Sequence, residues 1–146
     1  MSISNRLLKE TKEIEKEDEY NFVVCSTGNS LREWSCRFKG PYGTPYQEGT
    51  FELFFQIPIS YPVSPPIVKF NKKKIFHANI HLFTGEICLD ILTSKWTPAW
   101  TLLYLLKAIL ILLSSPEATS PLNCDAGNLL RVNDHRGYCS LASMYC

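Results

Sequence analysis

The sequence predicts an α+β fold of a single domain over residues 1–146, and three observations support this prediction. A segment with helical periodicity opens the chain, short strand-like segments separated by turn residues follow it, and a strongly apolar segment begins near residue 100. A chain of this length buries about two thirds of the surface that its unfolded form exposes, which suits one hydrophobic core.

The first element is an amphipathic helix, predicted over residues 3–17. Ile3, Leu7, Thr11 and Ile14 recur at the spacing of one helix face, while charged side chains mostly occupy the other faces. The simplest interpretation of those charges is a solvent-exposed surface.

Four strands are predicted next, at residues 22–26, 34–38, 51–57 and 67–70. The middle two alternate apolar and polar side chains with period two, as half-buried strands do. Glycine- and proline-rich turns at residues 28–29, 40–45 and 62–66 separate the strands. Connections this short favour an antiparallel meander.

Two contrasting segments follow the strands. Residues 71–98 show no clear periodicity and contain both His77 and Cys88, and loops of this length in compact domains usually serve function. Residues 100–113 form the longest apolar run, interrupted by Lys107, but a membrane span needs about 20 apolar residues. They therefore predict a buried core helix that ends near residues 114–116, followed by a weaker helical region from about Gly127 to the C-terminus.

The charge balance and the cysteines narrow the class of function. The chain has 15 Lys and Arg residues and 14 Asp and Glu residues, so it is nearly neutral. It therefore lacks the positive electrostatic field that attracts nucleic acid or an anionic membrane. The N-terminus has no apolar signal-peptide core, which predicts reduced thiols in an intracellular protein. The spacing of the six cysteines matches no zinc pattern, so we expect no metal site.

Cys88 is the candidate nucleophile, because it lies in the long loop with an Asn, a Gly and an Asp nearby. A thiol nucleophile needs access, a route to the thiolate and donors for an oxyanion. A cysteine hydrolase would pair it with a histidine, for which His77, His81 and His135 are candidates. Each histidine alone also fits a hydrogen-bonded structural residue, and a cysteine between Ile and Leu also fits a small buried side chain.

Several motifs occur in a fixed order around Cys88 and upstream of it. They are His77-Ala78-Asn79, Gly85-Glu86-Ile87-Cys88-Leu89-Asp90-Ile91-Leu92, Trp96-Thr97-Pro98-Ala99, and the proline-marked stretches at residues 40–49 and 61–66. Together they resemble the ubiquitin-conjugating enzyme (E2) family over nearly the whole chain. The resemblance implies the UBC-like fold: an N-terminal helix, a four-stranded antiparallel meander, an active-site loop, a central helix and a short C-terminal helical region.

Two departures from the family motif concern the active-site loop. Ala78 stands where the family has proline, which frees φ, restores an N–H and predicts a looser loop. The nine-position interval from Asn79 to Cys88 is one longer than in most members. Both departures, together with Ser120-Pro121-Leu122 and Asp125-x-Gly127-Asn128, are similar to the peroxisomal branch of the family.

The resemblance assigns roles to the residues of the loop. Cys88 would accept ubiquitin from an activating enzyme as a thioester, and Asn79 would either donate to the oxyanion or hold the loop in shape. Asp90 would position the incoming lysine, with a plain surface acid as the alternative, and His77 would be structural.

Two residues after the central helix bear on the acceptor. Ser120 stands at the mouth of the site, where many members have Asp. A hydroxyl carries no charge, so the chain is expected to favour another acceptor, including a cysteine. Cys124 is close in sequence, and a buried side chain is the simpler expectation for it.

The resemblance also implies partners and a location. The partners are ubiquitin or a ubiquitin-like protein, an E1 activating enzyme, an E3 RING ligase and a substrate protein, with peroxisomal import receptors as candidate substrates. No cofactor is expected, because the activating enzyme consumes the ATP. The expected location is cytoplasmic, with recruitment to the peroxisomal membrane by a partner.

The contacts with E1 and E3 would come from the first helix and two loops, through Arg6, Lys9, Pro62, Val63, Pro98 and Ala99. Val63 is smaller than the aromatic that many members have there, so weaker or different ligase contact is predicted. The alternatives are a carrier of another ubiquitin-like modifier and a non-catalytic ubiquitin-binding variant. The presence of Cys88 speaks against the second.

Overall fold

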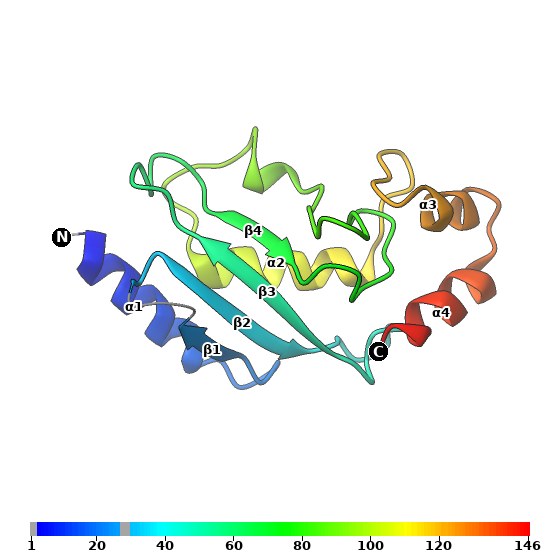
Figure 1. Cartoon of the computed structure of the whole chain (residues 1–146), viewed down its shortest axis with the longest axis horizontal. Coiled ribbons are helices and arrows are strands. Elements are labelled where there is room, and N and C mark those ends of the chain that lie inside the picture. The colour runs from blue at the N-terminus through cyan, green and yellow to red at the C-terminus, as the bar shows by residue number, and fades with distance from the viewer. Residues whose placement is uncertain (1–2, 27–29) are drawn as a thin grey trace.

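The computed structural model describes residues 3–26 and 30–146. Its sheet has four strands in the order β1-β2-β3-β4, each antiparallel to its neighbours (Figure 1): β1 (Val23–Ser26), β2 (Glu33–Lys39), β3 (Thr50–Gln56) and β4 (Ile67–Phe70). The predicted antiparallel meander is confirmed. The turn predicted at Gly28 and Asn29 lies outside the described residues.

The alternation of side chains along β2 and β3 builds the inner face of the sheet. The register pairs buried residues directly with one another: Trp34 with Phe55, Cys36 with Leu53, and Phe38 with Phe51. The rings of Trp34 and Phe55 stack at a centroid distance of 4.2 Å. Burial of these side chains supplies the hydrophobic core on which the helices pack.

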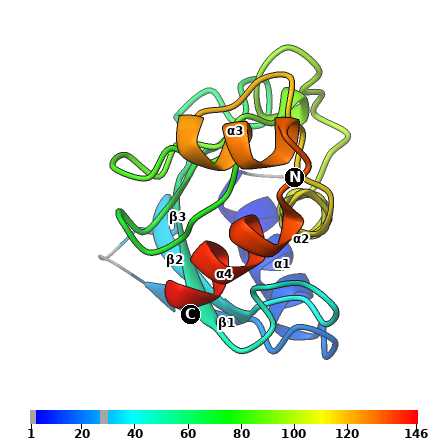
Figure 2. The ribbon, with the colours of Figure 1, turned by 90° about the vertical axis from the view of Figure 1, so that its right-hand side faces the viewer.

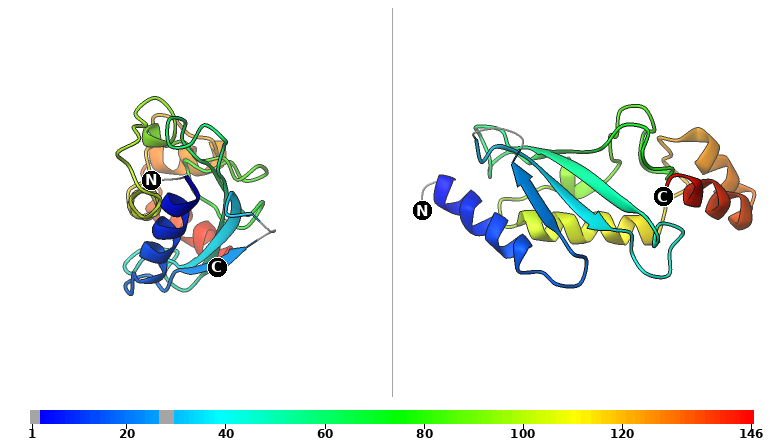
Figure 3. Two further views of the ribbon diagram at one scale, coloured as in Figure 1. Left: turned by 90° about the vertical axis from the view of Figure 1, so that its left-hand side faces the viewer. Right: turned by 60° about the horizontal axis from the view of Figure 1, so that its bottom comes forward.

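Two helices pack against the sheet. α1 (Ile3–Glu15) ends slightly before the predicted residue 17, and α2 (Leu102–Ser114) runs behind the sheet beside α1 (Figures 1 and 3). The α2 helix begins after Thr101, whose hydroxyl accepts a hydrogen bond from the Tyr104 N–H at 3.2 Å. Its leucines are buried except Leu103, which is half-buried, so the predicted core helix is confirmed.

The prediction of one weak helical region from Gly127 onward is wrong in both its start and its continuity. The chain forms α3 (Cys124–Arg131) and α4 (His135–Met144), which lie at the end of the molecule opposite α1 (Figures 1 and 2). The side chains of Asn123 and Asp134 cap them by accepting hydrogen bonds from backbone N–H groups of the first turn.

The segment between β4 and α2 has more structure than its lack of periodicity suggests. Residues 75–80 are all buried, and backbone bridges pair Lys69 with Glu86 and Ile80 with Ile87. A short 3-10 helix, Asp90–Leu92, follows Cys88. The loop that carries the candidate nucleophile is therefore anchored in the core.

Candidate active site

Cys88 presents an accessible thiol on a fixed backbone. The residue is exposed, and its backbone N–H donates to the Asn79 carbonyl at 2.9 Å. The alternative interpretation of Cys88 as a small buried side chain is therefore wrong. We call Cys88, residues 76–79 and residues 117–123 the cysteine cradle.

The Asn79 side chain holds one wall of the cradle. It is 1% exposed, and its Nδ2 donates to the carbonyls of Glu117 and Ser120 at 2.8 and 3.3 Å. Its Oδ1 accepts from the Glu117 N–H at 2.7 Å. Both N–H bonds of the amide are thus directed at the loop that precedes α3, and an amide has two of them.

His77 is fixed by the backbone at both ring nitrogens. Nδ1 accepts from the Asn79 N–H at 3.0 Å, so Nε2 carries the hydrogen and donates to the Leu112 carbonyl at 2.8 Å. The ring is 0% exposed, and this burial lowers the pKa of His77 to about 4. His77 is therefore a neutral ring at neutral pH.

The hydrolase alternative needs a histidine at the thiol. His81 accepts backbone N–H bonds from Phe83 and Thr84 at Nδ1, and His135 is exposed at the start of α4. Within the described residues, the structure places no histidine in a hydrogen bond with Cys88. This arrangement does not favour a Cys–His pair.

The other predicted site residues are on the surface. Asp90 is exposed, and its carboxylate lies 3.6 Å from Lys95 Nζ. Ser120 is exposed, and its carbonyl accepts from Asn79. Cys124 is exposed at the first position of α3, so the expectation of a buried cysteine there is wrong, because the helix turns this position outward.

The six predicted partner residues do not form a uniform surface. Val63 is 76% exposed, Lys9, Pro98 and Ala99 are also exposed, and Pro62 is half-buried. A shallow groove of about 310 Å³ joins α1 to the loop before α2, lined by Arg6, Lys9, Glu10, Glu13, Pro98, Ala99 and Thr101. We call α1 together with segments 58–66 and 93–101 the partner corner.

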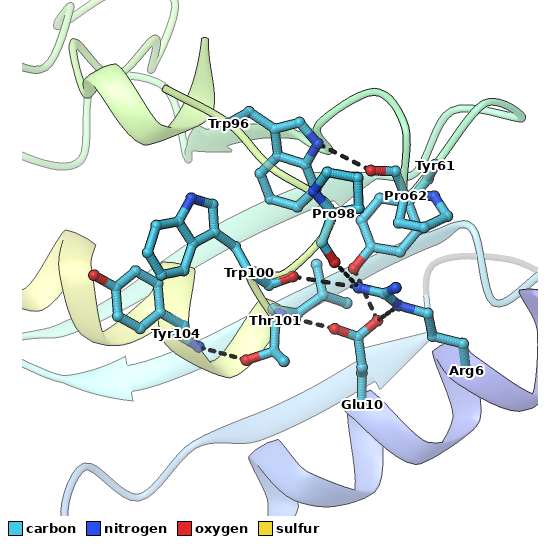
Figure 4. A network of polar contacts seen from close by, with 10 residues as sticks. Arg6, Glu10, Tyr61, Pro62, Trp96, Pro98, Trp100, Thr101 and Tyr104 are labelled. Atoms are coloured by element: carbon cyan, nitrogen blue, oxygen red, sulfur yellow. Dashed lines mark hydrogen bonds and ion pairs between the residues drawn. The ribbon is translucent and has the colours of Figure 1, made fainter. Parts of the chain in front are cut away.

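Arg6 is different, because its guanidinium is already engaged inside the partner corner. It donates through one terminal nitrogen to the Pro98 and Trp100 carbonyls at 3.0 and 3.3 Å, as Figure 4 shows. It also pairs with Glu10 at 3.3 Å and lies over the Tyr61 ring at 5.3 Å. A residue predicted to contact partners is thus also a brace between α1 and the two loops.

Glu10 lies at the centre of these contacts. It is 4% exposed, and its carboxylate accepts from the Tyr61 hydroxyl at 2.8 Å and from the Leu102 N–H at 3.0 Å, besides Arg6 (Figure 4). A carboxylate at the N-terminus of α2 also interacts favourably with the helix dipole. Nearby, Trp96 Nε1 donates to the Pro62 carbonyl at 3.0 Å and ties the two loops together.

Glu10, Tyr61 and Tyr138 are the important residues that the sequence analysis missed. Glu10 stands on the face of α1 beside the apolar stripe, and its buried position shows only in its contacts with residues far along the chain. Tyr138 donates and accepts hydrogen bonds at the back of the cradle. A charged residue at a helix position adjoining the apolar face was the available signal.

The described residues contain neither a membrane-spanning helix nor a metal-binding cluster. Across residues 3–26 and 30–146, every helix falls short of the length and apolar character that crossing a bilayer requires. In the same part of the chain, no group of three His, Cys, Asp or Glu side chains is arranged to hold a metal ion.

Comparisons with known proteins agree with the fold and the motifs. The family model described as ubiquitin-conjugating enzyme matches residues 6–146. The chain is 50% identical to the protein named peroxin-4 of Arabidopsis thaliana, covering 96% of this chain and 90% of that protein. It is 49% identical to the ubiquitin-conjugating enzyme E2 pex4 of Dictyostelium discoideum, with 96% and 94% covered.

A solved structure is similar over the full fold. It is that of the H. polymorpha ubiquitin-conjugating enzyme Pex4p in complex with the soluble domain of Pex22p. The two chains superpose with a TM-score of 0.90 at 35% identity, covering 99% of this chain and 96% of that one.

Proposed function

Because the chain belongs to the ubiquitin-conjugating enzyme family, we propose that Cys88 is the residue on which this E2 transferase carries ubiquitin as a thioester. The observation that carries the proposal is an exposed thiol on a backbone fixed by the Asn79 carbonyl. Within the same proposal, residues 1–146 form one ubiquitin-conjugating domain, which the match over residues 6–146 supports.

The first step exchanges one thioester for another. The Cys88 thiolate attacks the thioester carbon that links ubiquitin to the activating enzyme, the new C–S bond forms, and the activating enzyme's thiolate leaves. One thiolate replaces another, so the step needs no histidine base. His77 and Asn79 are both uncharged, and their proposed role is to keep the Cys88 thiol in place. Their hydrogen bonds to the backbone and to the loop before α3 support this role.

The second step transfers ubiquitin to an acceptor. A lysine amine has an ordinary pKa of about 10.4, so a nearby carboxylate and partial desolvation help to orient and deprotonate it. Asp90 is the proposed carboxylate, although Lys95 offsets part of its charge. Ser120 offers a hydroxyl in place of a second acid, which supports a cysteine acceptor, for which thiolate again replaces thiolate.

The test of the proposal is incubation with activating enzyme, ATP and ubiquitin. We expect a product about one ubiquitin heavier that thiol reductant removes, and a reductant-resistant product in Cys88→Ser, because an oxygen ester replaces the thioester. Cys124→Ser is the matched control, an exposed cysteine that should leave the thioester unchanged. A failure with ubiquitin and with every ubiquitin-like protein would contradict the proposal.

The partner corner is the proposed surface for the activating enzyme and for a RING ligase. As an E2 enzyme the chain acts with ubiquitin, an activating enzyme and a ligase. Lys9, Val63, Pro98 and Ala99 are exposed and lie on α1 and the two adjoining loops, which supports this assignment. Pro62 and Arg6 contribute mainly through the shape of the corner.

We further propose that the enzyme is cytoplasmic and works at the peroxisomal membrane, held there by a protein similar to Pex22p, with import receptors as substrates. The peroxin-4 relatives and the solved Pex4p complex support this. A Pex22-like protein from the same organism should retain the purified chain on an affinity column. Failure of such binding would contradict the proposed recruitment while leaving the thioester chemistry intact.

A further inference from the structure

Ala78 brings a buried backbone donor into the cysteine cradle. The residue is 0% exposed and stands where the family motif has proline, a residue with a fixed φ and no N–H. A buried N–H without a partner is destabilising, so the substitution requires an acceptor. The Tyr138 hydroxyl of α4, 60 residues along the chain, accepts the Ala78 N–H at 3.3 Å.

The hydrogen bonds that continue from Tyr138 run in one direction. The Tyr46 hydroxyl donates to the Phe76 carbonyl at 2.6 Å, so its hydrogen is already used. The contact of 3.1 Å between the two hydroxyls then requires Tyr138 to donate to Tyr46. The tyrosine relay, formed by Tyr46 and Tyr138, therefore begins at the Ala78 N–H and ends at the Phe76 carbonyl.

Both tyrosines of the relay are buried, and their hydroxyl groups stay protonated. Tyr46 is fully buried and Tyr138 is nearly so. Burial raises the pKa of both tyrosines above the ordinary value, so both hydroxyls keep their hydrogens at neutral pH.

The Ala78 backbone is held on its other side as well. Its carbonyl accepts from the N–H groups of Leu122 and Asn123 at 2.8 and 3.2 Å, where the chain enters α3. The next residue, Asn79, accepts the Cys88 N–H through its carbonyl. Any shift of Ala78 is thus passed to the backbone of Cys88. These hydrogen bonds hold Ala78 on both sides, which argues against the looser loop predicted from the loss of proline.

We propose that Tyr138 is a positioning residue of this enzyme: its hydroxyl takes over the task of the missing proline by fixing Ala78, and through Asn79 it holds Cys88 in place. The inference rests on the proposed role of Cys88. It makes α4 part of the support of the active site, so the two C-terminal helices influence transfer without touching the substrate.

The test is a double-mutant cycle between Tyr138→Phe and Ala78→Pro. Loaded enzyme is mixed with free cysteine or, in a parallel reaction, free lysine, and the rate of thioester loss is measured in single turnover. In the Ala78 background, we expect Tyr138→Phe to slow discharge roughly three- to tenfold, because the buried N–H loses its acceptor. In the Ala78→Pro background that N–H is gone, and the same change should alter the rate by less than about twofold.

Tyr145→Phe is the matched control. Tyr145 follows α4, and its ring contacts Phe76 at 6.1 Å, as the Tyr138 ring does at 5.9 Å, but the Tyr145 hydroxyl is not part of the relay. The Tyr145→Phe variant should lose its thioester at the wild-type rate. Equal slowing by Tyr138→Phe in both backgrounds, or no slowing in either, would overturn the inference, because a general loss of packing does not depend on residue 78.

A second measurement covers the case in which Ala78→Pro fails to fold. Hydrogen exchange of the Ala78 and Cys88 amides should accelerate roughly tenfold in Tyr138→Phe and stay unchanged in Tyr145→Phe. Unchanged exchange at Ala78 would overturn the inference. If the wild-type enzyme forms no thioester at all, the proposed function of Cys88 fails instead, so the two failures are distinguishable.

Discussion

The partner corner and the cysteine cradle are held together by different chemistry. In the corner, a buried carboxylate, that of Glu10, receives hydrogen bonds from Arg6, Tyr61 and Leu102. In the cradle, the hydrogen bonds described above join neutral groups: backbone, the Asn79 amide and the His77 ring. A buried charge is costly once a partner is removed, whereas a neutral hydrogen bond contributes about 1 kcal/mol. Single substitutions should therefore cost most stability in the corner.

The largest effect is expected from Glu10→Ala. It leaves the Arg6 guanidinium without its carboxylate and the Leu102 N–H without an acceptor, so the free energy of unfolding should fall by about 3 kcal/mol. Urea unfolding measures the change. Glu15→Ala, an exposed glutamate on the same helix, should cost less than about 0.5 kcal/mol. Similar losses in the two variants would refute the distinction between corner and surface.

The second effect is a pH dependence that His77 introduces in the cradle. Its folded pKa of about 4 is lower than the ordinary value of 6.5, so below neutral pH the unfolded chain binds a proton that the folded chain does not. Stability is therefore complete above the ordinary pKa and falls as the pH drops toward the folded pKa. The total is about 3 kcal/mol, of which about 2 kcal/mol is lost between pH 7 and pH 5.

Urea unfolding at these two pH values checks the prediction. The His77→Gln variant should lack this part of the pH dependence, because it has no ring to protonate. His135→Gln, at an exposed histidine, should keep it. A His77→Gln variant that loses as much stability as the wild type over this range would contradict the burial of a neutral ring.

The third effect separates the two roles considered for Asn79. Asn79→Ala removes the hydrogen bonds to Glu117 and Ser120, so stability should fall by about 2 kcal/mol and the Glu117 amide should exchange faster. Asn79→Asp keeps an oxygen that accepts from the Glu117 N–H, so that amide should stay protected. A slowing of discharge of about a hundredfold in Asn79→Ala, with Glu117 exchange unchanged, would instead assign Asn79 to the oxyanion.

The smallest effect concerns the exposed rim of the partner corner. Val63→Phe adds apolar surface where the side chain is 76% exposed, so affinity for a RING ligase should rise by about 0.5–1 kcal/mol, with stability unchanged. Titration of the two proteins by calorimetry measures it, with Ile59→Phe, another exposed residue of the same segment, as the comparison. An affinity that does not rise would contradict the placement of the ligase at Val63.

Much of the fold was predictable because its signals are local. The period-two alternation in residues 34–38 and 51–57 gave the strands of the meander, and the apolar run after Trp100 gave α2. The division between α3 and α4 was missed because the capping residues Asn123 and Asp134 were not used as start signals.

The site was predictable only where a motif stands in consecutive residues. Cys88, Asn79 and His77 lie in such motifs, and the structure brings His77 and Asn79 into direct contact and joins Asn79 to Cys88. Glu10 and Tyr138 act through contacts that span 51 to 92 residues of sequence. Partners at that separation leave no pattern in a single sequence, so the braces behind both regions emerged only in the fold.

The role of Cys88 is tested by comparing the loading of the wild-type chain and Cys88→Ser in the presence of activating enzyme, ATP and ubiquitin. We expect a reductant-sensitive ubiquitin adduct in the wild type and a reductant-resistant adduct in the variant. A reductant-sensitive adduct that persists in Cys88→Ser would place the thioester on another cysteine and contradict the role of Cys88 as the ubiquitin carrier.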